Sequence, residues 1–505
     1  MTAAPAQTPL FDAAGARAID AHAIDVNGIA GIDLMRSASA AAERVVRGRF
    51  PHARRIVVVA GGGNNGGDGC EVARLLAGHG REVRIVRVAT RSAAGDAATT
   101  LADAIAAGVP VAEQPDGEIA GALSEAELVI DALLGTGATG GPTGGVARAI
   151  ERIAESGLPV VALDVPSGVD ASTGEALGAV VHADVTVAFH ADKLGLRISP
   201  GRELAGLVVV VPIGIPDGAP VEPAAIGVRD GRSLLPGRTV GGSKYDAGAV
   251  LVIGGSVGMA GAPALVAAAA LRSGAGVVTA LVPESVQPAV AGQLREAMVH
   301  PLPSQRPDLE IERYAERARC VVLGPGIGRE ASAEEIVRAA LALDRPLVVD
   351  ADALWWVARD PSAIAARMAP TVITPHAGEA ARLLGIDAAE IARHRLRTVH
   401  ALVDRTGAVA LLKGADTLVL APDGRLGVRL DDCAALATAG SGDVLAGVIG
   451  ACLARGADAW TGAIAGAAAH VAAGRAAAAA RPGGAIIAGD LIEHLAVLAR
   501  PGSAL

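Results

Sequence analysis

The chain has 505 residues, a formal net charge of −9 at pH 7 and 51% hydrophobic residues, enough for two large α/β domains that each bury a core. Aromatic residues make up only 2% of the chain, which argues against base-stacking surfaces for single-stranded nucleic acid. The chain is acidic overall and has no cluster of basic residues that would bind a polyanion, so we expect small-molecule partners and no nucleic acid.

Disulfide-rich secreted proteins and membrane proteins are also disfavoured. The four cysteines show neither zinc nor disulfide spacing, so we expect them to be reduced core residues: Cys70, Cys320, Cys433 and Cys452. No basic start followed by an apolar run marks a signal peptide, and we expect a cytoplasmic protein. The uncharged segment 247–271 is long enough to span a membrane, but glycines and a proline interrupt it, which favours a strand, a glycine loop and a helix.

The first half of the chain alternates helical and strand patterns. Helical patterning covers 13–48 and then Glu71–Ala77. Near-continuous apolar runs predict buried strands at Arg55–Ala60, Val83–Val88, Leu128–Asp131, Val160–Asp164 and Leu207–Val211. Such strands, separated by helices, predict a parallel sheet that is covered on both faces. Ligands bind such sheets at the carboxyl ends of the strands, where Asn64, Asp131 and Asp164 fall.

A segment rich in proline and glycine separates the two halves. Periodicity is lost over 212–220, so we place the domain boundary near Val221 and predict domains over 1–220 and 221–505. The second half restarts with an apolar strand, a glycine loop and a helix. We expect strands at 249–253, 320–323, 347–350, 371–373 and 409–412, and helices at 263–271 and 463–480.

Polar residues of the first half suggest an oxygen-lined ion and phosphate site. The loop Asn64–Asp68 follows a strand and precedes a helix, a context in which glycine loops bind phosphate or ions, although Asn-Gly also favours a plain turn. Asp131 and Asp164 each end a strand, and either could simply cap a helix. The oxygens of Asn65, Asp131 and Ser167 together suit an alkali or alkaline-earth cation, not zinc.

Three motifs of the first half resemble those of the NAD(P)H-hydrate epimerase family: Asn64–Gly69, Asp131–Gly137 and Asp164–Gly168, within a similarity over about 13–216. The resemblance implies a Rossmann-like three-layer domain with K⁺ at Asn65, Asp131 and Ser167. It also implies that Asp164 transfers a proton at the hydrated nicotinamide ring. The hydrated dinucleotide would be bound by Asn64, Asn65, Gly66, Gly67, Asp68, Gly135, Thr136, Gly137, Ala138, Thr139, Gly140, Gly141 and Asp164.

The run Thr438–Gly447 is the most informative stretch of the chain. Its glycines let backbone N–H groups approach a phosphate at the positive end of a predicted helix, and Asp443 is placed to take the proton of a substrate hydroxyl there. Lys413 and Thr417 follow a strand and suit phosphate oxygens, and His376 follows another. Taken alone, Asp443 could be a helix cap, Lys413 a solvated strand end and His376 a loop residue bonded to backbone.

The second half resembles the ADP-dependent NAD(P)H-hydrate dehydratase family of the ribokinase-like superfamily, over about 226–500. The motifs that carry this are Leu251–Ser256, Gly324–Gly326, Asp350–Leu354, Thr374–Glu379, Lys413–Thr417 and Gly440–Asp443. The resemblance implies a ribokinase-like α/β domain that uses Mg²⁺ and binds the hydrated dinucleotide through Ala262, Gly326, His376 and Asp443. ADP or AMP would be bound by Lys413, Gly414, Ala415, Asp416, Thr417 and Gly442.

These resemblances imply a bifunctional repair enzyme, which we expect to be a homo-oligomer. One domain would interconvert the R and S epimers of NADH or NADPH hydrate, and the other would dehydrate the S epimer while ADP becomes AMP and phosphate. A small-molecule kinase fused to a nucleotide-binding domain is the alternative enzyme, but it leaves the motif Thr374–Glu379 unexplained. A catalytically silent nucleotide-sensing scaffold is a third reading, against which Asp443, Lys413, Asp131 and Asp164 argue.

Overall fold

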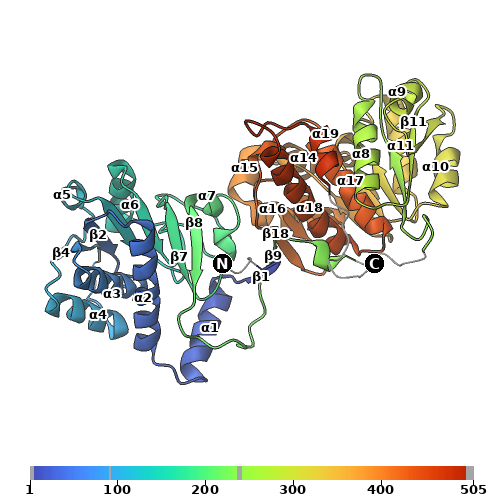
Figure 1. Ribbon diagram of the computed structural model, residues 1–505. Coiled ribbons are helices and arrows are strands. Elements are labelled where there is room, and N and C mark those ends of the chain that lie inside the picture. Colours follow the sequence, from blue (N-terminus) through green and yellow to red (C-terminus); the bar gives the residue numbers. More distant parts are fainter. Residues whose placement is uncertain (1–4, 90–91, 236–241, 496–505) are drawn as a thin grey trace. The chain divides into compact units, whose positions relative to one another are not determined.

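The computed structural model describes residues 5–89, 92–235 and 242–495. They form two compact units, which we describe separately: 9–225 in one, and 5–8 with 226–495 in the other (Figure 1). Strand β1 (Gln7–Leu10) is the edge strand of the second unit's sheet, where it lies next to β9 (Ala225–Val228). Nothing in the sequence indicated that a segment from the start of the chain extends this sheet.

A seven-stranded parallel sheet forms the centre of the first unit, in the order β4-β3-β2-β5-β6-β7-β8. Its strands are β2 (Arg55–Ala60), β3 (Glu82–Arg87), β4 (Val111–Glu113), β5 (Leu128–Ala132), β6 (Val160–Leu163), β7 (Val185–Phe189) and β8 (Leu207–Val211). Successive side chains of β2 enter different clusters: Ile56 packs on one face of the sheet and Val57 on the other. Both faces are therefore buried, which confirms the predicted parallel α/β fold.

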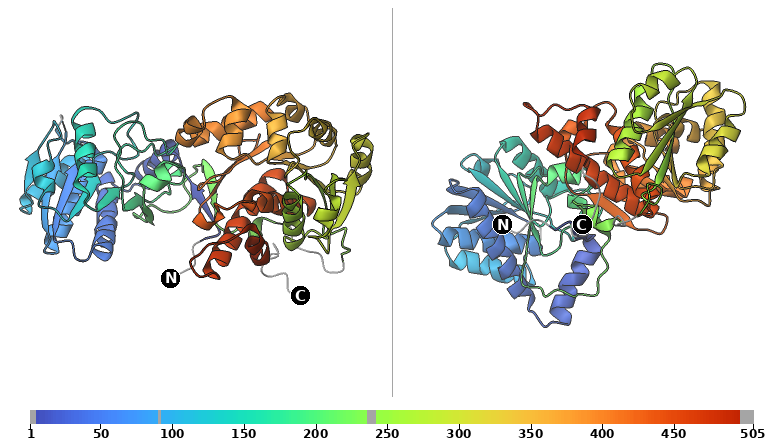
Figure 2. Two further views of the ribbon diagram at one scale, coloured as in Figure 1. Left: turned by 90° about the horizontal axis from the view of Figure 1, so that it is seen from above. Right: turned by 45° about the vertical axis from the view of Figure 1, so that its right-hand side comes forward.

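Helices cover both faces of this sheet (Figures 1 and 2). They are α1 (Ala13–Asp25), α2 (Gly31–Arg49), α3 (Asn64–Gly78), α4 (Gly95–Ala106), α5 (Ala120–Leu123), α6 (Gly144–Ser156) and α7 (Gly201–Leu204). The helical patterning over 13–48 corresponds to two helices, α1 and α2, and the chain breaks at 26–30, where Gly28 adopts a positive φ of 70°. The helix expected from Glu71 begins at Asn64, so the glycine motif forms its first turns.

The second unit is built on an eleven-stranded sheet in the order β1-β9-β18-β17-β16-β15-β14-β13-β10-β11-β12. The remaining strands are β10 (Ala249–Ile253), β11 (Val277–Pro283), β12 (Met298–Leu302), β13 (Cys320–Leu323), β14 (Leu347–Val349), β15 (Thr371–Ile373), β16 (Val409–Leu412), β17 (Leu418–Leu420) and β18 (Leu426–Arg429). The strands from β12 to β16 pair in parallel, whereas β17 pairs antiparallel with both β16 and β18. Seven adjacent parallel strands thus end at one edge of the sheet.

Three long helices pack on one face of this sheet: α8 (Gly261–Arg272), α17 (Ser441–Ala454) and α18 (Ala459–Ala479). The other helices are α9 (Gln287–Ala291), α10 (Pro307–Ala315), α11 (Ala331–Leu341), α12 (Asp352–Val357), α13 (Ser362–Ala365), α14 (Ala377–Leu384), α15 (Ala388–Arg393), α16 (Arg395–Thr406) and α19 (Ala488–His494). The uncharged segment 247–271 folds as expected, into β10, a glycine loop and α8.

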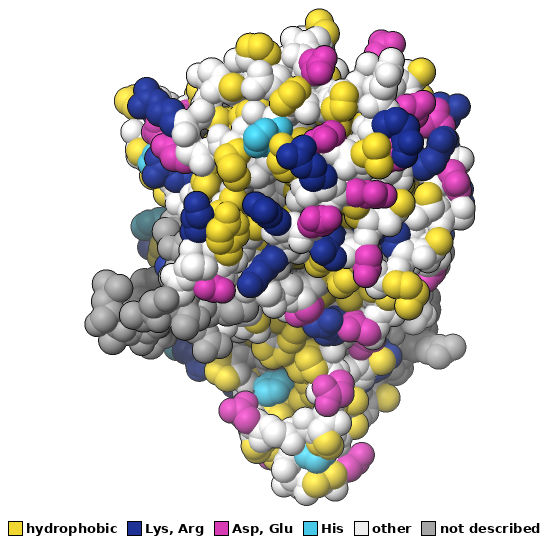
Figure 3. All heavy atoms as spheres, turned by 90° about the vertical axis from the view of Figure 1, so that its right-hand side faces the viewer, with side chains coloured by type: hydrophobic (Ala, Val, Ile, Leu, Met, Phe, Trp, Pro, Cys, Tyr) yellow, Lys and Arg dark blue, Asp and Glu magenta, His cyan; other side chains and the backbone are white. Residues whose placement is uncertain are grey.

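The surface charges and the burial of the cysteines largely agree with what the composition predicts. Lys and Arg side chains lie among Asp and Glu on the face shown in Figure 3. None of the helices within the described ranges has both the length and the hydropathy needed to cross a bilayer. Cys70, Cys320 and Cys452 are buried free thiols as expected, but Cys433 is only half-buried and lines a cavity described below.

Candidate active sites

Helix α17 presents its N-terminus at the carboxyl edge of the second unit's sheet. Gly440 immediately precedes the helix with a positive φ of 81°, a conformation that glycine adopts without strain. Asp443 lies in the first helical turn, and none of the described residues donates a hydrogen bond to its carboxylate. The helix N-terminus and a free carboxylate therefore face the same region, as the sequence predicts for phosphoryl transfer to a hydroxyl.

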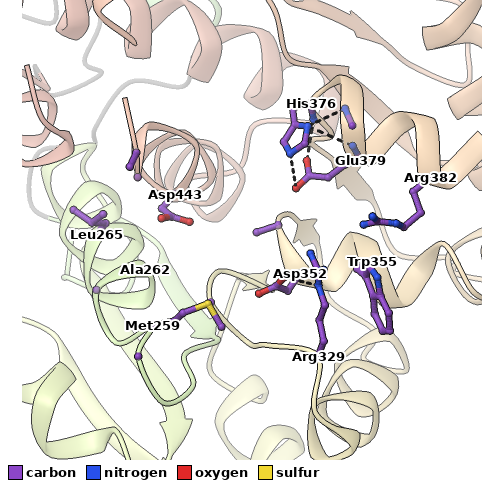
Figure 4. A pocket seen from close by; sticks show the side chains of 17 residues that line it. Met259, Ala262, Leu265, Arg329, Asp352, Trp355, His376, Glu379, Arg382 and Asp443 are labelled. Atoms are coloured by element: carbon purple, nitrogen blue, oxygen red, sulfur yellow. Dashed lines mark hydrogen bonds and ion pairs between the residues drawn. The ribbon is translucent and has the colours of Figure 1, made fainter. Parts of the chain in front are cut away.

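One cavity of about 670 Å³ opens on the side of this loop that carries Asp443. All four residues expected to contact the hydrated dinucleotide line it: Ala262, Gly326, His376 and Asp443. Figure 4 shows Asp443 and Ala262 on one side of the cavity, with His376 across from them. The structure thus brings together residues from four separate segments of the chain.

A second cavity of about 920 Å³ lies on the other side of the loop. Five of the six residues expected to contact the adenine nucleotide line it: Lys413, Gly414, Ala415, Thr417 and Gly442. The sixth, Asp416, does not: its side chain is 1% exposed and forms an ion pair of 2.7 Å with Arg395. His376 lines both cavities, so the two spaces adjoin near the first turn of α17, which holds Gly442 and Asp443.

A buried charge network supports the floor of this site. The ammonium of Lys413 lies 2.8 Å from a carboxylate oxygen of Asp350 and 3.8 Å from one of Glu379. Burial lowers the pKa of Lys413, but Asp350 and Glu379 outweigh burial and raise the pKa above its usual value. Lys413 is therefore a fixed cation, and its ammonium nitrogen is 3.5 Å from the position a Cβ on Gly442 would occupy. These contacts exclude the alternative that Lys413 is merely a solvent-exposed residue at the end of a strand.

Two titratable groups that line this cavity, Asp443 and His376, have shifted pKa values. Burial, with the negative charge of Asp350, raises the pKa of Asp443 to about 6, against the opposing effect of Lys413. Burial and the nearby Lys413 lower the pKa of His376. The His376 Nδ1 accepts hydrogen bonds from the backbone N–H of Gly378 at 3.0 Å and Glu379 at 3.4 Å. The imidazole is therefore neutral and caps α14 while it lines the cavity, so the structural reading of His376 holds, and its contact with the dinucleotide stays a prediction.

Sequence reasoning missed a buried histidine beneath the loop. The Ser441 hydroxyl, at the first residue of α17, lies 3.2 Å from the His470 Nε2 on α18. Burial lowers the pKa of His470 to about 4, so this ring is uncharged at neutral pH. His470 also lines the second cavity. The only signal in the sequence was a histidine within an alanine-rich helix, which does not distinguish a core residue from a site residue.

The first unit has a separate polar site, which lies at the carboxyl ends of β2, β5 and β6. Asp164 follows β6 with a positive φ of 65°, a strained conformation for a residue with a side chain. Its carboxylate accepts a hydrogen bond from the Thr136 hydroxyl and lies 2.5 Å from the Lys193 ammonium. Burial raises the pKa of Asp164, but Lys193 and Thr136 outweigh it, and the net pKa is lowered. Asp164 is thus held as a carboxylate. Sequence reasoning did not identify Lys193.

Two of the three residues of the expected cation site contact each other directly, and Asn65 shares the Leu134 carbonyl with Ser167. The buried carboxylate of Asp131 accepts hydrogen bonds from the Ser167 hydroxyl at 2.6 Å and the Ser167 backbone N–H at 2.8 Å. The Asn65 amide nitrogen donates to the Leu134 carbonyl at 2.8 Å, which fixes the orientation of the amide. The Asn65 Oδ1 is buried and has no hydrogen-bond partner within the described residues. A buried oxygen without a hydrogen-bond partner among the described residues is a suitable environment for a cation.

The remaining expected residues of this site occupy the loops around Asp164. Asn64, Asn65, Gly66, Gly67 and Asp68 form the first turns of α3, and a Cβ on Gly66 would lie 2.1 Å from the Gly61 carbonyl oxygen. Burial, with the charge of Asp164, raises the pKa of Asp68 well above its usual value. Gly135, Ala138 and Gly140 line a small cavity of about 20 Å³, and Thr136, Gly137, Thr139 and Gly141 share their loop.

Comparison with known proteins agrees with both halves of the chain. The profile described as NAD(P)H-hydrate dehydratase matches residues 250–496, and that described as YjeF-related protein N-terminus matches 31–195. The bifunctional NAD(P)H-hydrate repair enzyme of Moorella thermoacetica is 38% identical over 484 residues, which cover 91% of this chain and 89% of the relative. That of Escherichia coli is 36% identical, with 95% and 92% covered.

A solved structure, the ADP/ATP-dependent NAD(P)H-hydrate dehydratase of Bacillus subtilis co-crystallized with ATP and Mg²⁺, is 27% identical. It aligns with a TM-score of 0.46 over 52% of this chain and 93% of its own. The fold and the two sites define a two-domain α/β enzyme class that combines an epimerase domain with a ribokinase-like dehydratase domain. The chain belongs to the family of bifunctional NAD(P)H-hydrate repair enzymes.

Proposed function

We propose that this protein repairs hydrated NADH and NADPH in two steps. The first unit interconverts the R and S epimers, and the second unit dehydrates the S epimer while ADP is converted to AMP and phosphate. The observation that carries this proposal is the position of Asp443, whose free carboxylate lines one cavity, next to Gly442, which lines the other. A hydroxyl on one side and a phosphate on the other can therefore meet at this loop.

The dehydration follows from the weakness of hydroxide as a leaving group. The ring hydroxyl attacks the terminal phosphorus of ADP, its proton passes to Asp443, and the bond between the phosphorus and the AMP oxygen breaks. The ring carbon–oxygen bond of the phosphate ester then breaks, inorganic phosphate leaves with the electron pair, and loss of a proton from the neighbouring carbon restores the double bond. Lys413 and the N-terminus of α17 stabilise the charge on the transferred phosphoryl group.

We also propose that the nucleotide is bound together with Mg²⁺. Phosphoryl transfer from nucleotides uses this ion to neutralise charge on the phosphate oxygens. The buried carboxylate of Asp350, beside Lys413, supplies an oxygen donor of the kind that Mg²⁺ prefers. Asp416 does not contact the nucleotide in this proposal. Its ion pair with Arg395 positions the loop that carries Lys413 and Thr417.

For the epimerase we propose that Asp164 takes a proton from the hydrated ring, with Lys193 as its charged partner. The lowered pKa keeps Asp164 ionised at neutral pH, which a proton acceptor requires. We further propose that K⁺ is held by Asn65, Asp131 and Ser167, because the Asn65 Oδ1 is buried without a partner and Asp131 supplies negative charge. The bound ion would supply positive charge that helps to place the substrate phosphates at the turns of α3.

Removal of K⁺ is expected to slow epimerisation and to leave dehydration unchanged. When K⁺ is replaced by tetramethylammonium, which is too large for a buried oxygen site, the epimerisation rate should fall at least about tenfold, the loss expected from one charge-assisted contact. Both rates are measured on the same protein by following the epimer ratio and the absorbance of restored NADH. An epimerisation rate that does not depend on the cation would remove K⁺ from the proposal.

The pH dependence of dehydration is expected to follow Asp443. A proton acceptor must be ionised, and burial raises the pKa of this carboxyl to about 6. The value of kcat/KM for S-epimer dehydration should therefore be constant above about pH 7 and fall as the pH decreases through about 6. Epimerisation should keep its proton acceptor over this range, because the pKa of Asp164 is lowered. Dehydration that stays constant down to pH 4.5 would contradict the role of Asp443.

The products distinguish this function from the alternatives. Incubation of NADH hydrate with ADP and Mg²⁺ should release inorganic phosphate in step with the absorbance of restored NADH. A small-molecule kinase would instead accumulate a stable phosphorylated metabolite, and a nucleotide-sensing scaffold would bind both compounds without turnover. Either of those results would overturn the proposed function.

A further inference from the structure

The end of the first cavity that lies away from Asp443 carries a cationic and aromatic group of residues. Arg329, Trp355 and Arg382 line it together with the residues already assigned to the reacting ring. Figure 4 shows these three side chains gathered on one side, with Asp443 and Ala262 on the opposite side. We refer to Arg329, Trp355 and Arg382 as the distal cluster.

Arg382 is the member of the distal cluster whose charge has no ion-pair partner among the described residues. It lies in the last turn of α14, and its guanidinium has no ion pair or hydrogen bond with any of the described residues. By contrast, Arg329 lies 3.3 Å from the Asp352 carboxylate and stacks over the Trp355 ring at 5.5 Å. A guanidinium without a carboxylate partner on a cavity wall is available for an anionic ligand, and phosphate suits its planar set of donors.

Trp355 offers the cavity an aromatic surface. Its side chain is half-buried and packs edge-on against Trp356, with ring centroids 4.7 Å apart. The Trp356 Nε1 in turn donates to the Gly328 carbonyl at 3.1 Å, so the pair is anchored to the loop after β13. The described chain is poor in aromatic residues. This anchored indole lines a ligand cavity together with Arg329 and Arg382, and Arg359, outside the cavity lining, also lies over its ring at 5.5 Å. Aromatic and guanidinium surfaces of this kind stack on nucleobases.

We propose that the distal cluster binds the adenosine half of the hydrated dinucleotide, with Arg382 contacting a phosphate group and Trp355 contacting the base. The proposal rests on the proposed dehydration, which places the nicotinamide ring at Asp443. A cavity of about 670 Å³ has room for more than a single ring. The phosphate is either the adenosine-side phosphate of the diphosphate bridge, which both NADH hydrate and NADPH hydrate contain and the mononucleotide lacks, or the 2′-phosphate that only NADPH hydrate contains.

The test compares full-length and truncated substrates. KM and kcat for dehydration are measured with the hydrates of NADH, NADPH and reduced nicotinamide mononucleotide, which lacks the adenosine half. The wild-type protein should show a KM for the mononucleotide hydrate at least about tenfold above that for the dinucleotide hydrates. Arg382→Ala and Trp355→Leu should each raise KM for the dinucleotide hydrates by about tenfold or more, with kcat nearly unchanged. Neither substitution should alter KM for the mononucleotide hydrate more than about twofold.

Arg405→Ala is the matched control, because it removes the same charge from an exposed position in the last turn of α16, outside both cavities. An effect of Arg382→Ala on both dinucleotides assigns the contact to the diphosphate, and an effect on NADPH hydrate alone assigns it to the 2′-phosphate. Equal KM values for wild-type protein on truncated and full substrates would overturn the inference and leave the dehydration intact. The inference would also be overturned if Arg382→Ala and Trp355→Leu left KM for the dinucleotide hydrates unchanged. An absence of turnover on every substrate would instead overturn the proposed function.

Discussion

Asp443→Asn is expected to abolish dehydration of the S epimer while the two epimers still interconvert. The substitution keeps the size and shape of the side chain but removes the group that accepts the hydroxyl proton, a loss of about 10²–10⁴ in rate. None of the described residues donates a hydrogen bond to the Asp443 carboxylate, so its replacement should cost little stability. The rates are measured by absorbance at the wavelength of NADH and by chromatographic separation of the epimers.

The other unit of the same chain supplies the control for this variant. Unchanged epimerisation, an unchanged Tm and unchanged ADP binding would show that only the proton acceptor has been lost. Dehydration by Asp443→Asn at a rate comparable with that of the wild-type protein would remove this residue from the mechanism.

Asp164→Asn is expected to slow epimerisation by about 10²–10⁴ and to leave dehydration of the S epimer intact. Asparagine tolerates the positive φ of 65° found at this position, so the loop can keep its conformation while the negative charge is lost. The rate of conversion of pure R epimer to S epimer measures the effect. Loss of both activities in this variant would indicate a folding defect or a wrong domain boundary.

In Asp164→Asn the Lys193 ammonium loses its carboxylate partner, although the Lys193 side chain is only 3% exposed. A second variant is needed to separate the effect of this unpaired buried charge from the loss of the proton acceptor. The double variant Asp164→Asn with Lys193→Gln removes both charges and the buried mismatch. If the carboxylate transfers the proton, this variant should fold stably and still epimerise slowly. Recovery of wild-type epimerisation in the double variant would show that Asp164 only neutralises Lys193.

Much of the fold could be predicted from the chain because its parallel strands are buried on both faces. Strands such as Arg55–Ala60 and Val409–Leu412 are continuous apolar runs, and their bounds agree with the prediction. The antiparallel strands β17 and β18 were not predicted, although they are no shorter than β15 and β16. The N-terminus of α3 was missed because Gly66 and Gly67 are poor helix formers, and close packing against Gly61 and Ala97 places them in the helix.

The candidate sites show the same division between local and long-range information. Asp443 and Asp164 lie at the ends of predicted elements, so their chemistry could be inferred from short motifs. Lys193 and His470 act on residues 29 positions away in each case, through the pairs Lys193–Asp164 and His470–Ser441. Pairs of this kind depend on which strands and helices are neighbours, and single-sequence patterns carry no information about that. Asp416 was assigned with its motif, although its side chain turns inward to Arg395.

A crystal structure with a non-hydrolysable ADP analogue, Mg²⁺ and the S epimer of NADH hydrate tests the central claim most directly. The account predicts the ring hydroxyl between the Asp443 carboxylate and the terminal phosphate, with the phosphate on Lys413 and the N-terminus of α17. A carboxylate of Asp443 that points away from the bound phosphate and hydroxyl, into the protein interior, would contradict it.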